Sequence, residues 1–219
     1  MVYAAIDKVP EIADDRPTVN FGQYALVGST VRSRPAWLKD TGRSNAVFEH
    51  NMLLWQRAQE DIMAIEKVKE YFTQCGIADR VREFDVSSAT VELAAQALSC
   101  EPCRIAKTLS FMVDGRAILV VAAGDAKIDN PKYKAQFGVK AKMLTPDEAE
   151  TLIGHAVGGV CPFGINDGVT VYLDNSLKRF ETVFPACGSS NSAIELSIEE
   201  LEKYSGYAAW IDVCKGWSE

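Results

Sequence analysis

Two features of this 219-residue chain have residue types and spacing that suit chemistry at an acyl or phosphate group. The first is a glycine-rich loop, Gly158-Gly159-Val160-Cys161-Pro162-Phe163-Gly164, whose glycines allow close backbone approach and can turn N–H groups toward an anion. The second is Lys107, about fifty residues upstream in the β-rich run 105–113. Such N–H groups can stabilise an oxyanion, and a lysine supplies a cation. Together they predict a hydrolytic or anion-binding site.

The placement of Lys107 within its strand supports a functional role. It has the same parity as Ile105, Leu109 and Phe111, so strand alternation turns it toward the side of the core. A buried lysine is costly unless it has a partner. The alternative is an edge position from which the side chain extends into solvent. We favour the functional interpretation.

The cysteines offer two further hypotheses. Cys161 could be a nucleophile with His155 as its base, but no carboxylate partner for that histidine is evident, and a free cysteine is usually a small core residue. Cys100 and Cys103 have CxxC spacing, yet the chain has no second CxxC pair and contains only two histidines, too few ligands for a four-coordinate zinc site. We therefore expect neither a metal nor another cofactor.

The composition is that of an ordinary folded domain, with 47% hydrophobic and 24% charged residues. No apolar run approaches the length of a membrane span and no signal peptide is evident, so we expect a cytoplasmic protein without membrane contact. The net charge of −7 argues against extended, non-specific nucleic-acid binding. One basic cluster is either a solvated face or a local phosphate-contacting patch: Lys127, Lys132, Lys134, Lys140 and Lys142.

The elements that must position these residues are of α+β type. The apolar residues of 1–55 do not recur with a helix or strand period, so we expect an N-terminal extension there and a domain over 56–219. Helices are predicted over 56–74, 87–98, 131–137, 146–153 and 197–204. Strands are predicted over 81–84, 105–113, 116–122, 139–144, 169–173, 182–186 and 193–196, with an Asp114-Gly115 hairpin turn. Without strict βαβ alternation, a mixed or largely antiparallel sheet is expected.

The order of the motifs resembles the YbaK/prolyl-tRNA-synthetase-associated editing domain family over roughly residues 62–215. The matching segments are Ala106–Leu109, His155–Gly164, Phe180–Val183, and Gly188 before Ala193–Leu196. The resemblance implies a mixed, largely antiparallel sheet that curves toward a barrel, with flanking helices. It also implies a deacylase that clears wrongly attached amino acids from tRNA, often proline tRNA, with prolyl-tRNA synthetase as a candidate partner.

The resemblance also implies roles for individual residues. Lys107 would hold the terminal phosphate or the ester carbonyl, and the N–H groups around Gly158 and Gly159 would stabilise the oxyanion while water, or a thiol of the substrate, attacks. The residues expected to shape the substrate pocket are His155, Pro162, Gly164, Gly188 and Ser189. The alternative is a non-catalytic module that grips an RNA 3′ end or a nucleotide in the same pocket. The amino acid that is removed and the oligomeric state stay open.

Overall fold

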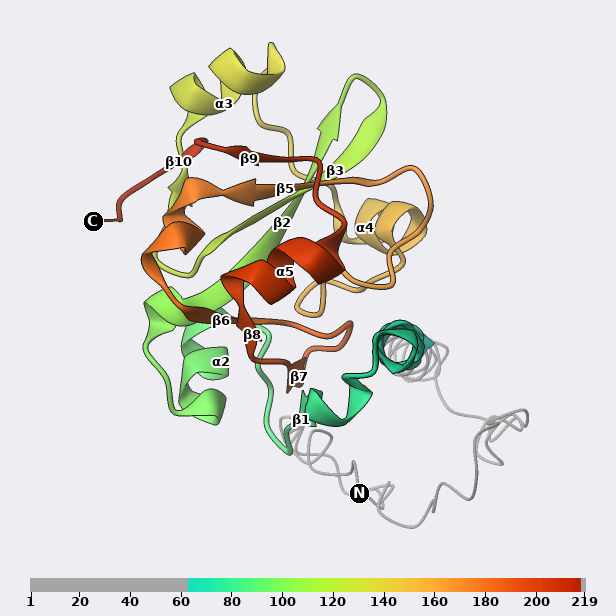
Figure 1. Cartoon of the computed structure of the whole chain (residues 1–219). Coiled ribbons are helices and arrows are strands. Elements are labelled where there is room, and N and C mark those ends of the chain that lie inside the picture. The colour runs from blue at the N-terminus through green and yellow to red at the C-terminus, as the bar shows by residue number, and fades with distance from the viewer. Residues whose placement is uncertain (1–62, 218–219) are drawn as a thin grey trace, which may run out of the picture. The chain divides into compact units, whose positions relative to one another are not determined.

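The computed structural model describes residues 63–217, so the extension predicted over 1–55 and its boundary lie outside the described residues. A six-stranded sheet in the order β8-β6-β2-β3-β5-β9 forms the centre (Figure 1). Its strands are β2 (Ile105–Val113), β3 (Arg116–Ala123), β5 (Thr170–Asp174), β6 (Thr182–Pro185), β8 (Leu196–Ser197) and β9 (Ala209–Ile211). Two small antiparallel pairs accompany it: β1 (Arg82–Glu83) with β7 (Ser192–Ala193), and β4 (Lys127–Ile128) with β10 (Cys214–Lys215).

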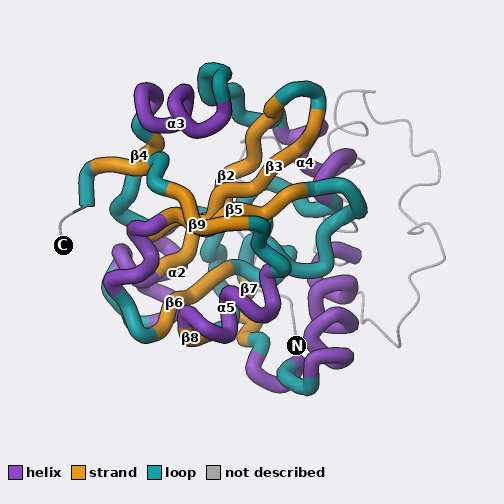
Figure 2. The backbone as a smooth tube through the Cα atoms, turned by 45° about the horizontal axis from the view of Figure 1, so that its top comes forward, coloured by secondary structure: helices purple, strands orange, loops and turns teal. Residues whose placement is uncertain are grey.

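Helices lie around this sheet (Figure 2). Residues 63–75 are helical, and the helices that follow are α2 (Val91–Leu98), α3 (Asn130–Phe137), α4 (Pro146–Ile153) and α5 (Ile198–Ser205). Short 3-10 turns occur at η3 (Ala78–Arg80), η4 (Pro102–Arg104) and η5 (Asn175–Arg179). In Figure 1, α5 crosses in front of the sheet, while α3 and α2 lie toward opposite ends of it.

The sheet is mixed, as the sequence predicts. β2–β3 and β6–β8 are antiparallel, whereas β2–β6, β3–β5 and β5–β9 are parallel. The parallel share of this main sheet is therefore larger than the largely antiparallel arrangement we expected. The parallel pairs arise because the chain leaves the β2–β3 hairpin and crosses over through helices and loops before it adds β5, β6 and β9.

The β2–β3 hairpin is the most local part of the fold. Its turn residues Asp114 and Gly115 both have positive φ, 47° and 78°, as the primed hairpin turns require. Seven consecutive residues of β3, Ala117–Ala123, are buried, so this strand is covered on both faces and forms the middle of the core. Lys107 is paired with Ala122 in this hairpin, which places it opposite the end of the buried strand.

The helix boundaries follow local capping signals, and one of them differs from the predicted start. Thr145 and Ser197 cap α4 and α5 through complete capping boxes, and Gly154 and Gly206 end these helices in the left-handed conformation. The start predicted for α2 at residues 87–88 is wrong. The Thr90 side chain accepts a hydrogen bond from the backbone N–H of Leu93, so the helix begins at Val91.

Two strand predictions need correction, and three short strands were not predicted. Residues 139–144 form no strand and contribute a single bridge between Met143 and Phe111. The run 193–196 divides between β7 and β8, which belong to different sheets. β4, β9 and β10 were not predicted, because each is only two or three residues long.

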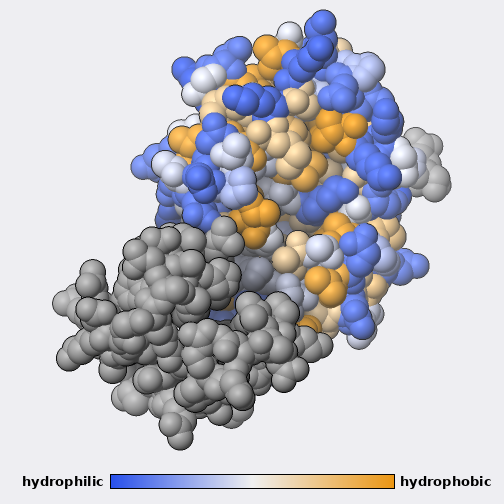
Figure 3. All heavy atoms as spheres, turned by 180° about the vertical axis from the view of Figure 1, so that it is seen from behind, coloured by the Kyte–Doolittle hydropathy of each residue, from blue (hydrophilic) through white to orange (hydrophobic). Residues whose placement is uncertain are grey.

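The surface of the described part is mixed in character. Figure 3 shows hydrophilic side chains surrounding smaller hydrophobic groups on one face. Within residues 63–217, no helix combines the length and the apolar character that crossing a membrane requires.

Candidate active site

Lys107 extends from β2 to the turn that follows β3. Its ammonium donates a hydrogen bond to the carbonyl oxygen of Gly124 at 2.8 Å and a second to that of Ala126. The side chain is half-buried, and this burial lowers the pKa of Lys107 below that of an ordinary lysine. An ammonium has three donors, so one N–H remains for a ligand. The lysine is therefore held in place by backbone carbonyls, and it forms no ion pair with a carboxylate of residues 63–217.

Gly158 and Gly159 join the glycine-rich loop to the loop around Gly188. The N–H of Gly188 donates to the carbonyl of Gly159 at 3.1 Å. A Cβ at Gly159 would lie 2.7 Å from backbone atoms of Gly188 and Ser189, so this approach requires glycine. Gly158 has φ +99°, and its Cα lies close to Ala89, just before α2.

The oxyanion role that we expected for Gly159 does not fit this geometry. Its N–H already donates to the carbonyl of Ala156 at 3.0 Å. Gly158 is different, because its N–H has no hydrogen-bond partner among residues 63–217. Of the two glycines, Gly158 is therefore the one whose N–H is available to a ligand, whereas Gly159 allows the two loops to pack closely.

The start of α2 connects the lysine to the glycine-rich loop. A Cβ at Gly124, one of the two partners of Lys107, would lie 2.8 Å from Val91 Cγ1, and one at Gly158 would lie 3.0 Å from Ala89 Cβ. Residues 89–91 therefore contact both sides of the candidate site. The first N–H groups of a helix lack intrahelical acceptors, so this end of α2 favours an anion. Sequence reasoning missed this segment because it placed the helix start earlier.

His155 does not line an exposed pocket. Its side chain is completely buried, Nδ1 accepts a hydrogen bond from the N–H of Cys161 at 3.4 Å, and Nε2 is buried without a partner in the described region. Burial, with a smaller contribution from the charge of Lys67, lowers the pKa of His155 to about 4. The imidazole is therefore neutral at pH 7 and acts as a structural group beneath the loop.

The loop does bring His155 close to Cys161, with 3.7 Å between Nδ1 and Sγ. The thiol is nevertheless fully buried, and this burial raises the pKa of Cys161 to about 12. No carboxylate contacts His155 among the hydrogen bonds of residues 63–217. A protonated, inaccessible thiol is a poor nucleophile, so the geometry favours a packing role for Cys161.

The other predicted pocket residues also support the loop from below. Gly164 and Gly188 have positive φ, and a Cβ at either would press against the backbone of the helix at 63–75 at distances of 2.8–3.3 Å. Pro162 is buried. Ser189 is buried too, and its hydroxyl lies 2.7 Å from Ser192 Oγ within the same loop. These positions shape the loop rather than present polar groups to solvent.

An aminoacyl-tRNA editing domain model matches residues 86–204, which include Lys107, the glycine-rich loop and the start of α2. The chain belongs to the aminoacyl-tRNA editing domain family.

Individual relatives of this editing domain extend the comparison. The uncharacterized protein YwhH of Bacillus subtilis (strain 168) is 56% identical over 156 residues, which cover 71% of this chain and 99% of YwhH. The proline--tRNA ligase of Geobacillus sp. (strain WCH70) is 25% identical over 170 residues, 71% of this chain but 30% of the ligase. A solved structure, "Crystal structure of a putative trans-editing enzyme for prolyl tRNA synthetase", is 29% identical with a TM-score of 0.64 and covers 70% of this chain and 98% of that one.

The five lysines of the basic cluster are exposed on the editing domain, on β4, on α3 and in the segment after α3. Lys132 forms an ion pair with Asp212 at 2.7 Å and also donates to the carbonyl of Cys214. The pairing of β4 with β10 places Lys127 opposite Lys215. Lys127 and Lys132 therefore lie beside β10, whereas Lys142 lies beside β2, because its carbonyl accepts a hydrogen bond from the N–H of Met112.

Proposed function

We propose that this editing domain hydrolyses, in trans, the ester bond of a mischarged tRNA, with proline tRNA as the first candidate. The observation that carries the proposal is the ammonium of Lys107, which is anchored to the carbonyls of Gly124 and Ala126 and keeps one N–H for a ligand. Gly124 and Gly158 both lie against residues 89–91 at the start of α2, which supports a site shared by Lys107 and the glycine-rich loop. Membership in the editing family supports a role in tRNA editing. The similarity to proline--tRNA ligases supports proline tRNA and a partnership with prolyl-tRNA synthetase.

In the proposed reaction, the oxygen of a water molecule adds to the ester carbonyl. The resulting oxyanion accepts a hydrogen bond from the N–H of Gly158, and Lys107 binds either the terminal phosphate or the carbonyl oxygen. The bond between the carbonyl carbon and the ribose oxygen then breaks, the ribose oxygen takes up a proton, and the free amino acid leaves. An activated ester needs orientation and charge stabilisation more than a side-chain nucleophile, which agrees with the buried state of Cys161.

The test is a deacylation panel with the purified full-length chain. Proline tRNA charged with alanine, with cysteine or with proline is incubated with the protein, and the aminoacylated fraction is followed over time. Loss of the alanyl or the cysteinyl species, with the prolyl species spared, is the expected result. Binding of tRNA without loss of any mischarged species would favour the non-catalytic RNA-binding module instead.

A further inference from the structure

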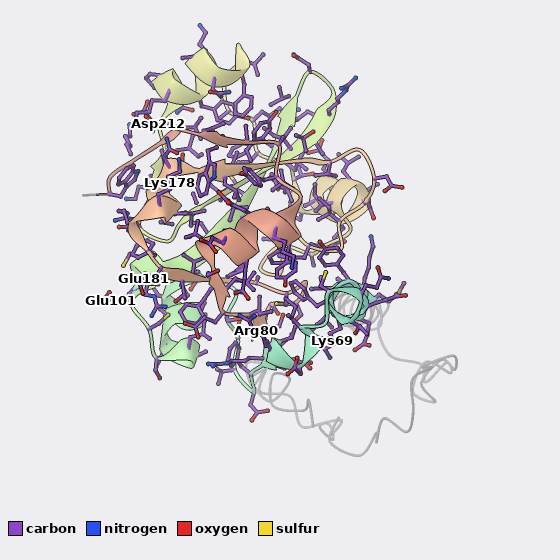
Figure 4. The ribbon with its side chains drawn as sticks, in the orientation of Figure 1. Lys69, Arg80, Glu101, Lys178, Glu181 and Asp212 are labelled. Atoms are coloured by element: carbon purple, nitrogen blue, oxygen red, sulfur yellow. The ribbon has the colours of Figure 1, made fainter. Side chains whose placement is uncertain are left out.

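A cavity of about 490 Å³ includes Arg179 in its lining, and Arg179 binds Asp125 in the turn that holds Lys107. Its lining residues are Lys132, Asn175, Lys178, Arg179, Asp212 and Trp217. They come from α3, from η5 and from the C-terminal segment, and Figure 4 shows Lys178 and Asp212 on the same side of the protein. The volume falls within the range of small-molecule sites. We propose that this cavity binds an unpaired nucleotide of the RNA acceptor end, a proposal that rests on the function proposed above.

The charges of the lining favour a phosphate. Lys132 is neutralised by Asp212 and Arg179 is paired with Asp125, whereas Lys178 has no carboxylate partner among the described residues. The ammonium of Lys178 is held 4.5 Å above the ring of Trp210. This cation is fixed at the surface of a protein whose net charge is −7, so an anion would be attracted here locally rather than by the molecule as a whole.

The aromatic wall favours a base. Trp217 lies against the guanidinium of Arg179, whose carbon is 5.1 Å from the ring centroid, and Arg179 is itself fixed by hydrogen bonds to Asp125 and to the carbonyl of Ser176. Grooves that bind single-stranded RNA combine cations for the backbone with aromatic rings on which bases stack. Trp217 is thus a ring already held in position.

Two polar atoms of the wall have no partner inside the described part of the protein. Asn175 Oδ1 and Trp217 Nε1 are both buried and make no hydrogen bond among residues 63–217. Such groups destabilise a fold until a polar ligand or solvent satisfies them. Both belong to side chains that line the cavity, but the atoms themselves are covered by protein and offer no direct contact to an occupant.

The position of the cavity fits an acceptor end whose ester lies at Lys107. Arg179 binds the Asp125 side chain, while Lys107 binds the carbonyls of the residues on either side of it, Gly124 and Ala126. A single turn therefore separates the two sites. An RNA strand that crosses this turn would place its terminal ester at Lys107 and a preceding nucleotide in the cavity.

The test compares two exposed lysines, each of which lies over an aromatic ring: Lys178 in the cavity and Lys203 on α5, near Tyr204. Binding of uncharged proline tRNA to full-length Lys178→Glu and Lys203→Glu is measured by fluorescence anisotropy at several salt concentrations. Lys178→Glu is expected to weaken binding about tenfold and to reduce the salt dependence by about one phosphate contact. Lys203→Glu should change the affinity less than about threefold, and thermal melting verifies that both variants fold.

A second comparison separates a base-binding site from a general attraction of anions. The trinucleotide CCA, cytidine monophosphate and polyglutamate are titrated against wild type, Trp217→Phe and Trp217→Leu. The trinucleotide should bind the Leu variant about tenfold more weakly and the Phe variant nearly as well as wild type, because the ring is kept. An affinity of the wild type for polyglutamate equal to its affinity for the trinucleotide would overturn the proposal. Equal tRNA binding by Lys178→Glu and Lys203→Glu would overturn it as well. Neither result depends on catalysis, so the inference can fail while deacylation is observed, and the reverse.

Discussion

Replacing Gly159 with alanine tests whether the glycine-rich loop and the Gly188 loop must lie this close together. The added Cβ would lie 2.7 Å from three backbone atoms of Gly188 and Ser189, whereas ordinary contact begins at 3.4 Å. The loops would have to separate by about 0.7 Å, the difference between these distances. The hydrogen bond from the N–H of Gly188 to the carbonyl of Gly159 would lengthen from 3.1 Å to about 3.8 Å, beyond the normal range.

The expected loss of stability combines two effects. Overpacking against backbone costs about 1–3 kcal/mol, and loss of the hydrogen bond adds about 1 kcal/mol. Gly159→Ala should therefore lower the free energy of unfolding by about 2–4 kcal/mol, measured by urea denaturation. Deacylation should fall as well, because Gly158 moves with its neighbour.

Gly168→Ala is the matched control. Gly168 also lies in a loop, but a Cβ there would have no atom within 4 Å, and the strain comes from its φ of +85° alone. Its expected cost is about 1 kcal/mol, without loss of activity at temperatures where the variant is folded. Equal costs for the two variants would refute the argument that close contact between the loops requires glycine at 159.

Three further predictions concern groups around the same loop. The free energy of unfolding should fall by about 3 kcal/mol from pH 7 to pH 4, because His155 binds a proton in the unfolded chain near pH 6.5 but in the folded protein only near pH 4. Urea denaturation of His155→Gln at both pH values should show that this contribution is gone. The same pH dependence in His155→Gln as in wild type would contradict the buried, neutral state of His155. Cys161→Ala should deacylate at the wild-type rate per folded molecule. A fall in this rate by several orders of magnitude would favour the hypothesis that Cys161 is a nucleophile. Thr90→Ala and Thr145→Ala each remove a helix N-cap and should each cost about 1 kcal/mol, but only Thr90→Ala should slow deacylation; equal rates would argue against a role for the start of α2.

The local elements of the fold could be predicted from sequence because their signals lie within a few residues. The Asp114-Gly115 turn and the capping boxes at Thr145 and Ser197 are of this kind, and the structure confirms each. The strands β9 and β10 could not be predicted, because two or three residues become strands only through pairing with β5 and β4. Residues 139–144 show the reverse case, since this β-rich run meets β2 only at Phe111 and forms a single bridge there.

The contacts of the candidate site residues could be predicted only in part. Strand alternation predicted that Lys107 turns toward the core, and its side chain is half-buried. Its partners are carbonyls of the turn after β3, and no sequence pattern reveals such acceptors. The glycines predicted that the backbone of this loop approaches another group closely. Only the structure shows that the N–H of Gly159 donates to Ala156, whereas that of Gly158 has no partner among residues 63–217. The same path brings His155 beside Cys161 and buries both.

The most direct test of the central claim is single-turnover deacylation of mischarged proline tRNA by wild type, Lys107→Ala and Lys107→Arg, with tRNA binding measured in parallel. If Lys107 stabilises charge in the transition state, Lys107→Ala should slow the reaction by about 100-fold or more while it still binds tRNA. Lys107→Arg should recover little, because a planar guanidinium cannot reproduce the contacts of the ammonium with Gly124 and Ala126. Unchanged turnover in Lys107→Ala would contradict the account.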